Sequence, residues 1–169
     1  SLVFPMLRRI PNNTHASLML RQKLDVVAQL RINNNNNLKF TTRYVELNGA
    51  MTVVEDHKGG AYGLEITRTI FPTMERPMMC EHYVVRNSGT VDMALQVPDL
   101  QQSFLTDPEK GVKGSYKVST HVEGAGVYKL KPGEEIEFDL VIQAGLKDEK
   151  FAEVDVKAAL AERKAFIDH

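Results

Sequence analysis

Residues 135–143 read Glu-Ile-Glu-Phe-Asp-Leu-Val-Ile-Gln, and this stretch decides the fold. From Ile136 to Ile142 the apolar residues recur at every second position, with acidic residues between them up to Asp139. Successive side chains of a β-strand point to opposite faces of the sheet, so this pattern indicates one buried and one wet face. That arrangement is typical of antiparallel sheets, because strands of parallel sheets read as continuous apolar runs.

The same alternation recurs along the chain. It is clear in residues 24–32, 91–97 and 116–122, and weaker strands fit residues 38–47, 50–57, 62–71 and 78–87. Glycine-containing turns separate these stretches: Asn48-Gly49, Lys58-Gly59-Gly60, Asn87-Ser88-Gly89, Gly124-Ala125-Gly126 and Lys131-Pro132-Gly133. Roughly nine or ten strands without intervening helices predict an all-β fold, an antiparallel two-sheet sandwich or supersandwich.

The pattern changes at the C-terminus. From about Asp148, a candidate N-cap beside Glu149, the sequence predicts a helix that runs to near His169. Two apolar stripes lie on roughly opposite sides of it, the first Phe151, Val154, Ala158, Ala161 and Ala165, the second Val156, Leu160 and Ile167.

A helix on the surface of one domain normally needs a single apolar stripe. The two stripes favour a helix held between two bodies, and the alternative is a helix wedged under a loop of its own domain. We therefore expect a sandwich over residues 1–146 and a C-terminal linker helix over residues 147–169.

Composition narrows the function classes. The chain has 169 residues and a formal net charge of −1, so we expect one domain and no nucleic-acid partner. No apolar run approaches the roughly 20 residues that cross a bilayer, so no membrane span is expected. The sequence begins at Ser1 without methionine and shows no signal-peptide pattern, so we expect either a processed N-terminus or, in preference, a fragment of a longer protein.

No residue pattern predicts a catalytic, cofactor or metal site. The five histidines, none at metal-ligand spacing, are His15, His57, His82, His121 and His169. His82 alternates with Cys80, which predicts a satisfied core or half-buried imidazole rather than a metal ligand. His15 and His57 lie near turns and are expected to face solvent. Cys80, the single cysteine, follows two methionines and is predicted to be a small core residue rather than a nucleophile.

The carboxylates and serines are equally uninformative. Glu55-Asp56 and Glu134-Glu135 are adjacent pairs, and neighbouring strand residues face opposite ways, so Glu134-Glu135 cannot flank a glycosidic bond. The acidic residues between Asp107 and Glu109 fit a turn. Ser17 and Ser103 have no neighbouring His or Asp that would mark an activated nucleophile.

Two stretches interrupt the strand pattern. The run Asn33–Asn37 is interpreted as a solvated hairpin loop between two strands, in preference to a polar ligand site. Residues 98–114 form a long connection, expected to be either a functional loop or a flap packed over the sheet edge or a neighbouring domain.

Three segments together carry a resemblance to a known family. The first is Leu7–Leu18, which leads into a strand; the second pairs Arg68-x-x-Phe71-Pro72 with Tyr83-x-Val85-x-Asn87-x-Gly89; the third is the closing helix Ala158–Ile167. In this order they resemble the N-terminal β-sandwich of bacterial six-hairpin glycosidases. In that family a linker helix and an (α/α)6 catalytic barrel follow the sandwich.

The resemblance implies a non-catalytic domain of a glycoside hydrolase that scaffolds and docks a catalytic (α/α)6 domain of the same parent chain. It carries over no catalytic residue, and it implies a periplasmic or cell-surface location. It also makes residues 98–114 a candidate carbohydrate contact. Two alternatives are an independent carbohydrate-binding or adhesion module of a cell-surface protein and a small enzyme with a site assembled in three dimensions. The absence of tryptophan weakens the sugar-binding alternative.

Overall fold

The computed structural model describes residues 2–8, 17–20, 25–73, 76–107, 114–148, 150–151 and 153–167. They form antiparallel sheets of seven and three strands, an N-terminal two-stranded hairpin and a C-terminal helix. The two antiparallel sheets and the C-terminal helix confirm the predicted fold class, and the separate hairpin is an addition to it. The larger sheet has the order β4 (Thr41–Leu47), β5 (Met51–Gly59), β6 (Tyr62–Pro72), β7 (Met78–Asn87), β12 (Glu135–Leu146), β10 (Tyr116–Glu123) and β9 (Gln101–Leu105).

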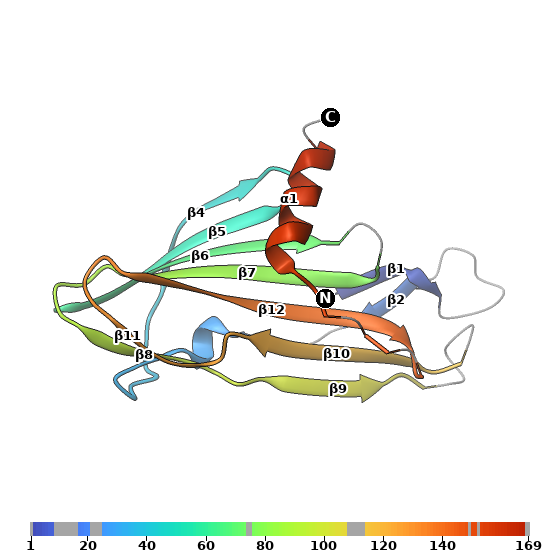
Figure 1. The fold of residues 1–169 in the computed structure, drawn as a ribbon, viewed down its shortest axis with the longest axis horizontal. Helices are drawn as coiled ribbons and strands as arrows, with labels where there is room; N and C mark the ends of the chain where they lie inside the picture. Colours follow the sequence, from blue (N-terminus) through green and yellow to red (C-terminus); the bar gives the residue numbers. More distant parts are fainter. Residues whose placement is uncertain are drawn as a thin grey trace.

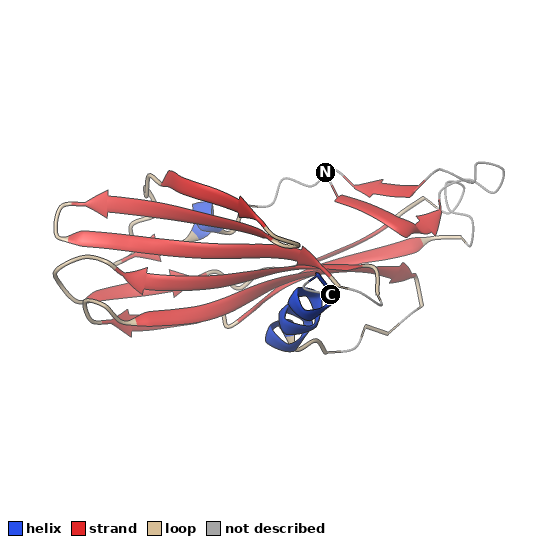
Figure 2. Ribbon diagram, turned by 90° about the horizontal axis from the view of Figure 1, so that it is seen from above, coloured by secondary structure: helices blue, strands red, loops and turns tan. Residues whose placement is uncertain are grey.

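The smaller elements lie on the two sides of this sheet. The three-stranded sheet has the order β11 (Gly126–Leu130), β8 (Met93–Val97) and β3 (Arg31–Ile32). The hairpin joins β1 (Leu2–Arg8) to β2 (Ser17–Leu20), and the 3-10 helix η1 spans Val27–Gln29. Figure 1 looks onto the seven-stranded sheet with helix α1 (Val156–Ile167) in front of it. Figure 2 shows α1 on one side of that sheet, and η1 and the hairpin on the other.

We call the side of the seven-stranded sheet that faces the three-stranded sheet the inner face, and the side that carries α1 the outer face. The main core lies on the inner face, where Tyr83 and Phe138 stack with their ring centroids 4.6 Å apart. Leu95 of β8 and Leu30 beside η1 complete it from the opposite layer, and both are fully buried. This is the buried row that the alternation of residues 135–143 predicts.

A second, smaller core lies on the outer face beneath α1. Phe71, Cys80 and Val141 come from three adjacent strands and pack around Val156 of the helix. Because both faces of β12 are covered there, every residue from Leu140 to Gly145 is buried. The helix therefore explains why the alternation of β12 ends in a continuous buried run.

One predicted strand is wrong. Residues 24–32 alternate in sequence, but residues 27–29 form η1 and only Arg31–Ile32 are extended. The Asp25 carboxylate accepts a hydrogen bond from the Ala28 amide at 3.2 Å and stabilises the helical turn. The buried residues are Val26, Val27, Leu30 and Ile32, so two consecutive residues point into the core, which a strand does not allow.

The predicted start of the C-terminal helix is also wrong. The helix begins at Val156, and Asp155 rather than Asp148 caps it. The Asp155 carboxylate accepts a hydrogen bond from the Ala158 amide at 3.0 Å, and its carbonyl accepts one from the Ala159 amide at 3.0 Å. This is the geometry of an N-cap residue.

The interpretation of residues 98–114 as one long connection needs a similar correction. Residues Gln101–Leu105 form β9, which pairs with β10 at one edge of the larger sheet. Four of its five residues are exposed, so it lacks the alternation that marks a half-buried strand. Residues 108–113 lie outside the described part of the chain.

The predicted turns are confirmed at several glycines. Gly49, Gly60, Gly124 and Gly133 have positive φ, the conformation that favours glycine. The run Asn33–Asn37 is exposed throughout, which confirms a solvated loop. It does not join two strands directly as a hairpin would, because the next strand, β4, begins only at Thr41. Asn33 also has a structural task, because its side-chain oxygen accepts a hydrogen bond from the Ala94 amide at 2.9 Å.

Candidate functional site

Helix α1 is the element that relates most directly to the predicted function. It is attached to the outer face through Val156, which is 2% exposed, and through partly buried Ala159 and Leu160. At its other end the Arg163 Nε donates a hydrogen bond to the Gly49 carbonyl at 3.1 Å. A Cβ atom added to Gly49 would lie 1.6 Å from the Ile167 side chain, so the turn between β4 and β5 closely contacts the last turn of the helix.

The two predicted stripes have different environments. The stripe Val156, Leu160 and Ile167 lies toward the sheet, where Val156 is buried and the other two are half-buried. Ala158, Ala161 and Ala165 of the first stripe are exposed, and the adjacent Phe166 is 62% exposed. Phe151 of the same stripe lies before the helix, half-buried, with the Lys117 ammonium 4.7 Å from its ring centroid. The chain thus covers one side of the helix and leaves exposed a row of alanines and one aromatic ring, together with the charged residues Lys157, Glu162 and Lys164.

A charged cluster secures the first turn of the helix to the sheet. Lys157 forms an ion pair with Glu137 of β12, and this hydrogen bond lowers the pKa of the Glu137 carboxyl and raises the pKa of Lys157. His82 of β7 lies beside it, with Nδ1 2.6 Å from Asp139 Oδ1 and Nε2 3.7 Å from Glu137 Oε1. His82 is buried, at 8% exposed, and hydrogen-bonded, which confirms the satisfied core imidazole of the two predicted alternatives.

A second charged cluster lies on the outer face near the β4 edge. Arg43 pairs with both Asp56 and Glu65, with Nη2–O distances of 2.6 and 2.7 Å, and Arg86 approaches Glu65 at 3.4 Å. The hydrogen bond from Arg43 is the main cause that lowers the pKa of the Glu65 carboxyl. These groups satisfy one another, and such an exposed network is suited to holding neighbouring strands together.

The inner face carries a more buried polar group around Arg68. The Tyr83 hydroxyl donates a hydrogen bond to Glu81, and burial is the main cause that raises the pKa of Tyr83. The Arg68 Nε and Glu55 Oε2 atoms are buried, and neither has a hydrogen-bond partner. Glu55 lies on the inner face and Asp56 on the outer face, so the two carboxylates of this adjacent pair do not converge.

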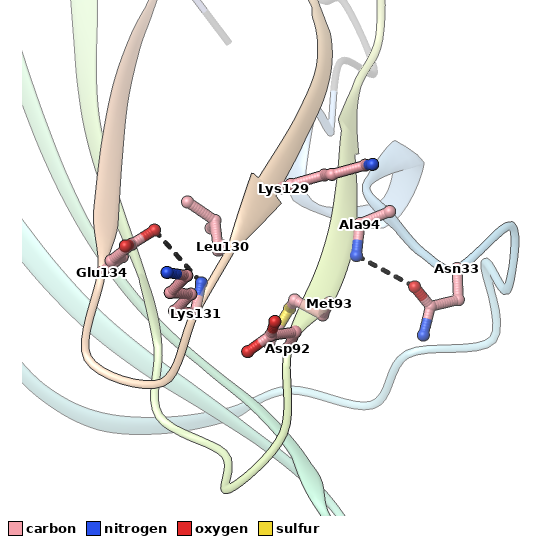
Figure 3. Close-up of a pocket in the computed structure, with 8 residues that line it drawn as sticks. All are labelled: Asn33, Asp92, Met93, Ala94, Lys129, Leu130, Lys131 and Glu134. Atoms are coloured by element: carbon pink, nitrogen blue, oxygen red, sulfur yellow. Dashed lines mark hydrogen bonds between the residues drawn. The ribbon is translucent and has the colours of Figure 1, made fainter.

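In the described part of the chain, two hollows with polar side chains lie away from α1. The first, about 330 Å³, lies at one end of the three-stranded sheet, where Asp92 and Glu134 lie on one side and Asn33 on the other (Figure 3). The Glu134 side chain there accepts a hydrogen bond from the Lys131 amide at 3.1 Å, so it closes the turn between β11 and β12. The second hollow, about 350 Å³, lies along the β9–β10 edge and is lined by Gln101, Gln102, Ser103, Ser119, Thr120 and His121.

The remaining residues considered from the sequence are dispersed. Cys80 is fully buried, as predicted. His57 is half-buried rather than solvent-facing, because its Nδ1 lies 2.8 Å from the Lys39 carbonyl and its ring packs on Phe40. His15 and His169 lie outside the described residues, and Ser17 belongs to β2. Within the described ranges, no group of three His, Cys, Asp or Glu residues is placed to share a metal ion.

Asn87 is the polar residue whose importance we did not derive from the pattern. It is fully buried, and its Nδ2 donates to the carbonyls of Val91 and Leu130 at 2.9 and 3.0 Å. Its Oδ1 accepts a hydrogen bond from the Gly89 amide at 2.9 Å. The sequence did point to this residue, because Asn87-x-Gly89 ends the motif Tyr83-x-Val85-x-Asn87-x-Gly89 that carries the family resemblance. In the structure this end of the motif joins the two sheets.

Comparisons with known proteins give limited information. No family model matches the sequence, and no curated protein matches it. A solved structure named "Putative kojibiose phosphorylase from human microbiome" is similar to 83% of this chain, with 11% sequence identity and a TM-score of 0.47. The match covers 25% of that protein, so this chain spans about a quarter of its length. In the part of this chain that the structure describes, no helix is long and apolar enough to cross a membrane.

Proposed function

We propose that this chain is a non-catalytic β-sandwich domain of a carbohydrate-active enzyme, whose parent is a glycoside hydrolase of the six-hairpin kind. Its role is to scaffold and dock the catalytic (α/α)6 domain of the same parent protein. The observation that carries the proposal is the exposed part of α1, where Ala158, Ala161 and Ala165 form a row of small residues and the Phe166 ring is also exposed. Small residues let another helix approach closely, and an exposed ring supplies an apolar anchor.

The sequence resemblance supports the same proposal. The motif strands β6 and β7 lie at the centre of the larger sheet, directly beneath α1. Phe71 of the Arg68-x-x-Phe71-Pro72 motif is fully buried in the outer-face core, so this motif positions the helix as well as the sheet. A domain with this role would sit in the periplasm or at the cell surface, with the rest of its parent.

The test is to read the parent gene beyond the His169 codon and to produce the region it encodes. We expect paired helices there, and we expect the two separately produced parts to bind each other in solution. Phe166→Asp should weaken this binding, whereas Val127→Asp should not, because Val127 is 65% exposed on β11, away from α1. A reading frame that ends at His169, or a downstream region without paired helices, contradicts the proposal.

The β9–β10 hollow favours a second function, a carbohydrate-binding module. Gln101 and His121, and Ser103 and Ser119, are cross-strand neighbours along this edge, and their amide, imidazole and hydroxyl groups suit a ligand rich in hydroxyls. Part of this hollow belongs to residues 98–114, the stretch considered as a carbohydrate contact. Calorimetry with a neutral disaccharide tests this second function. A heat of binding that Ser119→Trp abolishes supports a carbohydrate-binding module, whereas the absence of any heat of binding to the isolated chain argues against one.

A further inference from the structure

The free edge of β4 differs from every other strand edge that the structure describes. All seven of its residues are exposed, and it pairs with β5 on one side alone. Tyr44, Val45 and Leu47 are 50%, 55% and 77% exposed. Figure 1 shows β4 as the outermost strand of the larger sheet. A strand in this position presents a row of unpaired N–H and C=O groups that can pair with another strand.

Few of the usual protective features are present on this strand. Proteins guard such edges with lysine, proline, bulges or very short strands. β4 contains neither lysine nor proline, and its one irregularity lies between Thr42 and Tyr44, so the stretch Tyr44–Leu47 is regular. Arg43, at that irregularity, is bound to Asp56 and Glu65 of its own sheet. By comparison, the opposite edge strand β9 begins with three exposed polar residues.

We propose that β4 is a strand-addition surface whose partner is β4 of a second copy of this chain, paired antiparallel about a two-fold axis. Side chains that oppose each other in such a pair must lie on the same face of the joined sheet. Tyr44 and Glu46 lie on the outer face, and Val45 and Leu47 on the inner face, because their partners on β5 do. The allowed registers therefore differ by two residues.

Charge selects one of these registers. When Val45 opposes Val45 of the second copy, each Glu46 opposes Tyr44, whose hydroxyl can donate to the carboxylate. A shift in one direction opposes Glu46 with Glu46, and like charges in this position are destabilising. A shift in the other direction opposes Tyr44 with Tyr44 and so removes the contact between Glu46 and Tyr44. The register centred on Val45 is therefore favoured by the outer face, where Glu46 meets Tyr44, and its regular part spans Tyr44–Glu46, because Leu47 then reaches the irregularity at Arg43.

The experiment uses the purified 169-residue chain and measures its mass by sedimentation velocity and light scattering over a wide concentration range. We expect a concentration-dependent dimer. Val45→Lys should raise its dissociation constant by about tenfold or more, while Val127→Lys, a matched change on another exposed strand, should leave it unchanged. Circular dichroism checks that both variants are folded. A monomer at every concentration, or equal effects of the two changes, overturns the proposal.

A second measurement tests the register. Opposed Cβ atoms on antiparallel strands lie about 4.5–5.5 Å apart, close to the separation that a disulfide bridges. Under mild oxidation Val45→Cys should therefore form a covalent dimer more rapidly than Glu46→Cys. The native Cys80 is buried and does not compete. Faster dimer formation by Glu46→Cys would overturn the proposed pairing. Both measurements use this chain alone, so their outcome does not depend on the docking of a catalytic domain.

Discussion

The side-chain amide of Asn87 donates a hydrogen bond to the Leu130 carbonyl at 3.0 Å, and this contact joins the larger sheet to the smaller one. The same amide reaches the Val91 carbonyl, and the Asn87 backbone pairs with the Gly133 amide at 2.8 Å and the Glu134 carbonyl at 2.9 Å. One fully buried side chain therefore fixes the turn after β7 and the end of β11. The shape of this junction depends on every one of these buried polar groups finding its hydrogen-bond partner.

Asn87→Ala should strongly destabilise the fold. The change removes three side-chain hydrogen bonds and leaves the buried carbonyl of Leu130 without this donor. An unsatisfied buried group costs about 1–3 kcal/mol, so we expect a loss of at least about 2 kcal/mol in the free energy of unfolding. Urea denaturation measures it. Asn35→Ala, in the exposed asparagine run, is the matched control and should cost much less.

Gly89→Ala tests the other half of the same motif. A Cβ atom at this position would lie 2.4 Å from the Ala61 carbonyl oxygen and 2.8 Å from the Gly63 amide nitrogen. Both are backbone atoms, so they cannot move aside cheaply, and we expect the melting temperature to fall markedly. At Gly59 an added Cβ would meet the end of the flexible His57 side chain instead, at 3.0 Å. Equal melting temperatures for Gly89→Ala and Gly59→Ala would contradict this explanation.

The predictable parts of the fold are the strands with one buried and one wet face. β10 alternates between buried and half-buried residues without a break, which the sequence of residues 116–122 shows directly. Edge strand β9 was missed because both of its faces are largely exposed, so burial imposes no pattern on its residues. Residues 24–32 were misassigned because their alternation is accidental: Ala28, expected to face the core, is exposed. The local hydrogen bond between the Asp25 carboxylate and the Ala28 amide stabilises the 3-10 turn in this segment instead of a strand.

The candidate site was predictable in kind but not in detail. The sequence shows two apolar stripes on the C-terminal helix, and the structure buries one and leaves most of the other exposed. The sequence does not show which stripe contacts the sheet. That choice depends on Phe71, Cys80 and Val141, which come from distant parts of the chain. The bond from Arg163 to the Gly49 carbonyl is equally non-local.

The start of α1 gives a direct comparison of two aspartates. Asp155→Ala should remove the bond from the Ala158 amide to the capping carboxylate and cost about 1 kcal/mol of stability. Asp148→Ala changes an exposed residue well before the helix and should be nearly neutral. Far-UV circular dichroism during urea unfolding measures both. A larger loss from Asp148→Ala would restore the earlier helix start that the sequence favours.

Cys80 predicts a pH dependence at the alkaline end. Burial, with smaller effects of Asp139 and Glu123, raises the pKa of its thiol from 9.0 to about 12. Between these values the unfolded chain loses the thiol proton while the folded chain keeps it, so stability falls as pH rises. One proton corresponds to a slope of at most about 1.4 kcal/mol per pH unit. Well below pH 9.0 the thiol is protonated in both states and contributes no slope.

Cys80→Ala isolates this contribution. The change leaves a small cavity beneath α1 and lowers stability at every pH, so the informative quantity is the slope and not the midpoint. We expect the free energy of unfolding of the variant to fall less steeply above pH 9.0 than that of the wild type. Tyr83, whose pKa burial also raises, is present in both proteins and cancels in the comparison. Identical slopes would show that the Cys80 thiol ionises as readily in the folded chain as in the unfolded one.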